Sequence, residues 1–163
     1  MSDPQQTSSS SSSGPVTARI LGYAGALPFL GCVCAGGLGL AVDGFDASRL
    51  LIGYAAVILS FLGGLHWGRV AASGAYDKSA GLWLVWSVIP SLLGWAALLM
   101  PPLPAVMVLS AGFVLALMVD LGRLGAVLSG SPRWPHWMQR LRLHLTFVAV
   151  ASLLSSLLKV GAA

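Results

Sequence analysis

The hydrophobic residues of this chain form five long stretches, separated by short polar or proline-containing segments. A helix that crosses the roughly 30 Å hydrocarbon core of a bilayer needs about 20 apolar residues. Each stretch is close to that length, and most charged residues lie between the stretches or at their ends. The pattern therefore predicts five transmembrane helices, at residues 20–42, 50–72, 80–100, 103–121 and 141–160.

The composition favours the same conclusion. Of the 163 residues, 56% are hydrophobic and only 9% are charged, and the mean hydropathy is +0.84. A soluble domain usually carries about 25% charged residues, so the bilayer must be the main solvent and the main partner of this chain. We expect an all-α, polytopic membrane helical bundle over residues 16–163. Residues 1–15 are rich in serine and nearly uncharged, which predicts a disordered N-terminal tail.

The positions of Lys and Arg predict how the chain crosses the membrane. With five spans, seven of these residues lie on the side of the N-terminus and two lie on the other side. Cytoplasmic loops are the ones enriched in Lys and Arg, so we expect the N-terminus in the cytoplasm and the C-terminus outside. The formal charge of +4 is scattered between apolar segments, and this argues against a nucleic-acid partner.

Small residues recur on one face of the second stretch. Ser60, Gly64 and Gly68 are four residues apart, and Gly63 widens the same face. Glycine costs a helix about 1 kcal/mol relative to alanine, whereas small residues let two membrane helices approach closely. We therefore expect this face to be a helix-packing surface centred on Gly64. Its partner would be another helix of the bundle or, alternatively, a second copy of the chain.

Pro28 lies inside the first predicted span and Pro90 near the middle of the third. A proline removes a backbone donor and clashes with the carbonyl four residues earlier, so each is expected to kink its helix. Broken helices at the membrane centre occur in transporters, but purely structural kinks are commoner.

Ionisable residues within membrane spans are costly, and they are therefore the first candidates for function. Six of them fall near one membrane face in the predicted topology: His66, Arg69, Asp120, Arg123, Arg142 and His144. Asp120 is the only acid inside any span. We expect its carboxylate to be ionised and paired with Arg69, Arg123 or Arg142, close to His66. The cluster would tie three helices together, or it would belong to a proton or ion pathway.

Recognisable catalytic and metal-binding motifs are absent from the sequence. There is no P-loop, no G-x-G-x-x-G, no H-E-x-x-H and no G-x-S-x-G. His66 and His144 could in principle ligate a haem iron, but no haem-attachment motif accompanies them. His136 and His144 lack a Cys or Glu partner for zinc. We therefore expect no enzymatic activity, no cofactor and no metal.

Several short segments together resemble one known family. The most specific is Ser-Phe-Leu-Gly-Gly-Leu-His-Trp-Gly at residues 60–68. The others are residues 21–25, 28–29, 54, 58–59, 87–92, 95, 120, 137, 141–142 and 145–146. They resemble the bacterial and mitochondrial domain-of-unknown-function family 3429 of transmembrane protein 69-like membrane proteins, over about residues 16–160. The resemblance implies a multi-pass protein of the inner membrane, and it implies no particular reaction.

These observations lead to a main functional hypothesis and an alternative. The main one is a non-enzymatic accessory or assembly partner of the bacterial inner membrane, acting through helix contacts with another membrane protein or as a homo-oligomer. The alternative is a small transporter or channel that uses the kinked helices and the polar cluster. An enzyme acting on lipid ranks third.

Overall fold

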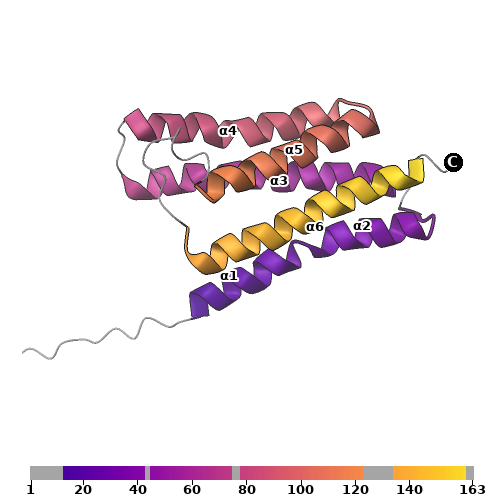
Figure 1. The fold of residues 1–163 in the computed structure, drawn as a ribbon, viewed down its shortest axis with the longest axis horizontal. Coiled ribbons are helices and arrows are strands. Elements are labelled where there is room, and N and C mark those ends of the chain that lie inside the picture. Colours follow the sequence, from indigo (N-terminus) through magenta and orange to yellow (C-terminus); the bar gives the residue numbers. More distant parts are fainter. Residues whose placement is uncertain (1–12, 43–44, 75–77, 123–133, 161–163) are drawn as a thin grey trace, which may run out of the picture.

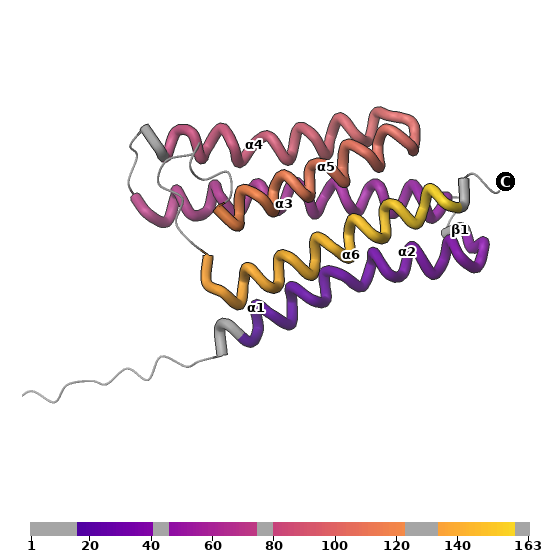
Figure 2. Tube along the Cα trace, viewed as in Figure 1, coloured from indigo at the N-terminus to yellow at the C-terminus, as the bar shows by residue number. Residues whose placement is uncertain are grey.

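A computed structural model of the chain describes residues 13–42, 45–74, 78–122 and 134–160. Over this range the long helices run back and forth between the two ends of a bundle (Figure 1). Five helical segments are long and apolar enough to cross a membrane. The predicted all-α bundle of five spans is therefore confirmed. The described chain starts at one end of the bundle and finishes at the other, as five spans require (Figure 2).

The first span is made of two helices, and each later span is a single helix. A short antiparallel hairpin joins the first span to the second, with Ala41 opposite Asp46. The elements are α1 (Ser13–Ala24), α2 (Leu27–Gly37), β1 (Ala41–Val42), β2 (Phe45–Asp46), α3 (Ala47–Ser73), α4 (Lys78–Leu98), α5 (Pro102–Asp120) and α6 (His136–Val160). Helix α1 thus begins at Ser13, before the expected boundary at residue 16, and residues 1–12 of the predicted tail lie outside the described residues.

The first span is interrupted next to Pro28, where a kink was predicted. Helix α1 ends at Ala24 and α2 begins at Leu27, with Pro28 as its second residue. Pro28 has no N–H to bond the carbonyl of Ala24, four residues earlier, and its ring would clash with that carbonyl in a continuous helix. A backbone carbonyl left without a partner is costly in hydrocarbon. The hydroxyl of Tyr54, on α3, donates a hydrogen bond of 2.8 Å to the carbonyl oxygen of Gly25. The break is therefore supported by the neighbouring span.

Pro90 has a different effect on the third span. Helix α4 continues through it, from Lys78 to Leu98. Pro90 is buried and faces α3, where its ring would lie 3.3 Å from a Cβ placed on Gly63. The helix is therefore not interrupted at Pro90, where a kink was predicted, and the proline ring packs against α3.

Among the described helices, α3 and α4 make the most extensive contact, and glycines lie at its tightest points. A Cβ on Gly63 would collide with the carbonyl oxygen of Ser87. A Cβ on Gly94 would lie 2.9 Å from the carbonyl oxygen of Ala56 and 3.3 Å from the hydroxyl of Ser60. Close approach of two backbones is what small residues allow in membrane helices. Ser60 and Gly63 thus pack inside the bundle.

The other two residues of the expected packing face are placed differently. Gly64 and Gly68 are exposed, and a Cβ built on either would meet no atom within 4 Å among the residues that the structure describes. The expectation that Gly64 is the centre of a packed face therefore does not hold within this chain. Successive helix residues are about 100° apart, so Gly63 can face α4 while Gly64 points outward.

Candidate functional site

Three ionisable side chains from three different spans meet inside one end of the bundle. Asp120 is the last residue of α5, His66 lies in the last third of α3, and Arg142 lies in the second turn of α6. Their exposed fractions are 6%, 5% and 7%. Because α3 and α5 end at this side and α6 begins there, the topology itself brings the three residues to the same depth (Figure 1).

Asp120 is the centre of this cluster, which we call the Asp120 cluster and which comprises His66, Asp120 and Arg142. The Nε2 atom of His66 lies 3.0 Å from Oδ1 of Asp120. A guanidinium nitrogen of Arg142 donates a hydrogen bond to the other carboxylate oxygen. A carboxylate that is ionised beside Arg142 can only accept hydrogen bonds, and with Asp120 in that form Nε2 of His66 is the donor. Each carboxylate oxygen therefore has a donor.

Aromatic side chains enclose His66. The ring of Trp83, from α4, is stacked on it with centroids 5.1 Å apart and an angle of 15° between the planes. The ring of Trp134 meets the imidazole edge-on, with the ring centroids 6.0 Å apart and an angle of 70° between the planes. The Trp134 ring also contacts Arg69. The guanidinium carbon of Arg69 lies 3.9 Å from the ring centroid of Trp134, which is a cation–π arrangement. The imidazole orientation is thus fixed by α4 and by the segment before α6 as well as by Asp120.

The remaining residues of the expected polar cluster take other positions. Arg69 is half-buried; its guanidinium lies over the Trp134 ring, and its charge also interacts with that of Asp120. His144 is exposed, and its Nδ1 lies 3.1 Å from the hydroxyl of Tyr23 on α1. It is two residues from Arg142 along α6 and so points in another direction. Arg123 lies outside the described residues.

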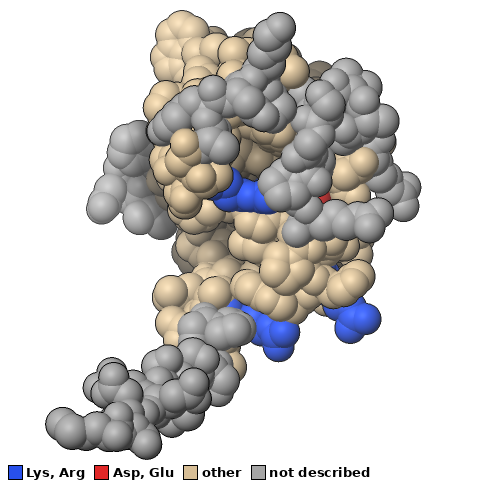
Figure 3. All heavy atoms as spheres, turned by 90° about the vertical axis from the view of Figure 1, so that its left-hand side faces the viewer, with Lys and Arg blue, Asp and Glu red and all other residues tan. Residues whose placement is uncertain are grey.

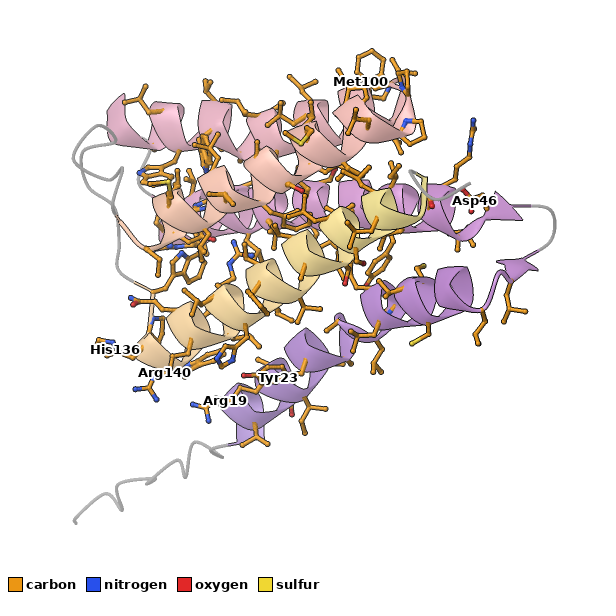
Figure 4. The ribbon with its side chains drawn as sticks, turned by 45° about the vertical axis from the view of Figure 1, so that its right-hand side comes forward. Arg19, Tyr23, Asp46, Met100, His136 and Arg140 are labelled. Atoms are coloured by element: carbon orange, nitrogen blue, oxygen red, sulfur yellow. The ribbon has the colours of Figure 1, made fainter. Side chains whose placement is uncertain are left out.

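Several basic side chains lie at the same end of the molecule as the buried cluster. Figure 3 looks onto that end and shows Lys and Arg side chains between uncharged residues. Figure 4 shows Arg19, Tyr23, His136 and Arg140 at the same end, whereas Asp46 and Met100 lie at the opposite end. The guanidinium of Arg19 also lies over Trp137, 5.4 Å from the ring centroid. Paired Arg and Trp side chains are suited to the headgroup region of a membrane.

The charges of the Asp120 cluster cancel when His66 is neutral, since one carboxylate faces one guanidinium. In a buried ion pair the mutual attraction offsets the cost of desolvation when the geometry is good and the remaining polar atoms are hydrogen-bonded. The arrangement therefore holds α3, α5 and α6 together at one end.

Groups of three or more His, Cys, Asp or Glu side chains placed to hold a metal are not found among the residues described.

Two members of this site were not expected from the sequence. Trp83 and Trp134 were not among the candidate site residues, yet both contact His66. Trp83 is 7% exposed, so it is a buried partner rather than a lipid-facing anchor. Its position at the same predicted membrane depth as His66 was the available signal, but sequence alone does not tell which face of α4 points inward.

Comparison with known proteins gives consistent matches. The sequence profile of a family described as "Protein of unknown function (DUF3429)" matches residues 14–158. The chain is 36% identical to Transmembrane protein 69 of Xenopus tropicalis over 149 residues, which are 88% of this chain and 54% of that protein. It is 34% identical to Transmembrane protein 69 of Mus musculus over 107 residues, which are 64% of this chain and 41% of that protein. The chain thus spans about half the length of these curated relatives. No solved structure matches it.

Proposed function

This chain belongs to the DUF3429 family of membrane proteins, and we propose that it is a non-enzymatic accessory protein of the bacterial inner membrane. In this proposal it acts by binding another membrane protein through the outward face of α3. Gly64, Trp67 and Gly68 lie on that face, and all three are exposed. We call it the α3 outer face.

The observation that carries this proposal is the open pair of glycines. Gly64 and Gly68 are four residues apart, which places them one above the other on the helix. Neither is needed for packing against the described part of the chain, because a Cβ on either would meet open space. Each costs α3 about 1 kcal/mol of helix propensity relative to alanine. A partner helix that packs closely against the two glycines would offset that cost.

The Asp120 cluster supports this role by keeping α3 in place. It links the end of α3 that carries Gly64 and Gly68 to α5 and α6. The transporter or channel alternative has weaker support. The cavity that reaches Arg142 is walled mainly by apolar side chains, whereas a pathway for ions or protons needs polar groups along its length.

A double substitution tests the proposed docking face. Affinity purification in mild detergent, followed by quantitative mass spectrometry, is expected to recover a stoichiometric partner with the wild-type chain. Gly64→Leu with Gly68→Leu should remove that partner, because two large side chains prevent close helix approach. Circular dichroism should remain unchanged, since both positions are open in the isolated chain.

Gly31→Leu is the matched control for this experiment. Gly31 is also exposed and also has open space around it, but it lies on α2. The control should keep the partner. Recovery of the chain alone from wild-type membranes would contradict the proposal. If the wild-type chain is instead recovered with a second copy of itself, the double substitution would separate the two copies. That result would show that the α3 outer face forms a homo-oligomer and does not bind another protein.

The proposed orientation can be tested with topology reporters. A reporter fused after Ala163 is expected outside the cytoplasm, and one inserted at residues 75–78 is expected in the cytoplasm. The reason is the asymmetry of seven to two in Lys and Arg between the two sides. The inverse result, with the residue 75–78 reporter outside, would show that the charge asymmetry does not set this orientation.

A further inference from the structure

A cavity of about 170 Å³ lies beside the Asp120 cluster, between the interrupted first span and α6. None of the three residues that define the α3 outer face lines it, although Phe61, at its opening, lies on the same side of α3. Most of its wall is apolar and comes from four spans. The apolar residues deepest in the bundle are Phe29, Ile58, Leu62, Phe113, Leu145 and Ala149.

The cavity reaches the outer surface of the bundle between α1 and α3. Leu21 and Phe61 belong to its lining, and they are 67% and 61% exposed. Both residues are part of membrane spans, so the medium at this opening is lipid rather than water. An occupant that enters here must first dissolve in the hydrocarbon of the bilayer. A head that carries a full charge is disfavoured on this route.

The inner end of the cavity is polar. Arg142 and Thr146 also line it, and they are one turn apart on α6. Both are buried. A guanidinium has five N–H donors and no acceptor, so its bond to Asp120 leaves donors for a second oxygen. Arg142 already has Asp120 as a counter-ion, so an added carboxylate would bring a second negative charge close to Asp120 in a low dielectric. This end therefore selects an uncharged hydrogen-bond acceptor.

The size of the cavity limits the group that fits. An apolar cavity of about 150 Å³ lined by Leu, Ile and Phe accepts a benzene ring, so about 170 Å³ corresponds to one substituted six-membered ring. The ring centroids of Phe29 and Phe113 are 6.2 Å apart in an edge-to-face arrangement. Aromatic side chains in a cavity wall pack well against a bound ring. We infer that this cavity is a binding site for the head of a lipid-soluble quinone. A ring carbonyl would accept hydrogen bonds from Arg142 and Thr146, and the tail would leave between Leu21 and Phe61. The inference concerns binding and includes no electron transfer.

The test uses the purified full chain in a fixed concentration of dodecyl maltoside, with decylubiquinone as the probe. The melting temperature of the protein should rise with the concentration of decylubiquinone and then level off, because a ligand that binds only the folded state stabilises that state. Ala149→Leu places a larger side chain in the cavity and should weaken binding at least tenfold. Thr146→Val removes one donor at constant shape and should weaken it about three- to tenfold, the size of one hydrogen bond. Ala151→Leu, on the exposed face of the same helix, is the matched control and should bind as the wild type does.

Three results would overturn the inference. One is the absence of saturable stabilisation by decylubiquinone. Another is equal binding by Ala149→Leu and Ala151→Leu or, if Ala149→Leu does not fold, equal binding by Thr146→Val and Ala151→Leu. The third is saturable stabilisation by phosphatidylglycerol, lost in the Thr146→Val or Ala149→Leu variant, with none by decylubiquinone. That result would assign the cavity to an acyl chain. None of these outcomes depends on the partner experiment at Gly64 and Gly68.

Discussion

Asp120→Asn is expected to lower the free energy of unfolding by about 3 to 5 kcal/mol, the usual cost of removing one partner of a buried ion pair. The amide keeps the shape of the carboxylate and can still accept a hydrogen bond from His66, but it carries no charge. Arg142 would then be a buried cation without a counter-ion, since its exposed fraction is only 7%. Thermal unfolding of the purified protein in detergent measures this loss.

A second substitution separates the ion pair from the other contacts of Asp120. Arg142→Met removes the cation while keeping a long apolar side chain, so Asp120→Asn with Arg142→Met should recover most of the stability. Buried ion pairs can often be replaced by apolar groups without a large penalty. Asp46→Asn is the matched control, because Asp46 is exposed at the opposite end of the bundle (Figure 4). It should change stability by less than about 0.5 kcal/mol. If Asp120→Asn behaves like Asp46→Asn, the ion pair does not stabilise the fold.

The five spans could be predicted because each depends on a simple property of a continuous segment. Apolar length and the polar gaps between stretches are sufficient for that. The meeting of His66, Asp120 and Arg142 at one depth also follows from span order, since each lies near a span end on the same side. Pro28 marks the interruption of the first span, because its effect on the backbone is local.

The rotation of each helix about its axis could not be predicted in the same way. Both faces of a membrane helix are apolar, so hydrophobicity does not show which residues point inward, as it does in a soluble protein. The small-residue face of α3 therefore appeared as one surface, although Ser60 and Gly63 contact α4 while Gly64 and Gly68 point outward. For the same reason Trp83 could not be assigned to His66. His144 was grouped with Arg142 by depth, yet it faces Tyr23.

This difference in rotation leads to a sharp prediction for two adjacent glycines. Gly63→Leu is expected to lower the free energy of unfolding by at least about 3 kcal/mol, the upper part of the range for overpacking a well-packed core. The first atom of the new side chain would collide with the carbonyl oxygen of Ser87, which is backbone and cannot rotate away. The ring of Pro90 would lie 3.3 Å from the same atom, so α3 and α4 would have to separate.

The same substitution at the next residue is the control, because it changes chemistry, volume and helix propensity equally. Gly64→Leu should leave the unfolding temperature of the isolated chain unchanged or slightly higher, since its Cβ meets open space and leucine is the better helix former. Both variants are compared by thermal unfolding in the same detergent, without a partner protein. Equal losses at the two positions would show that α3 is rotated differently from the arrangement described. A loss of stability in Gly64→Leu alone would show that the packed face of α3 is centred on Gly64, as the sequence pattern predicted.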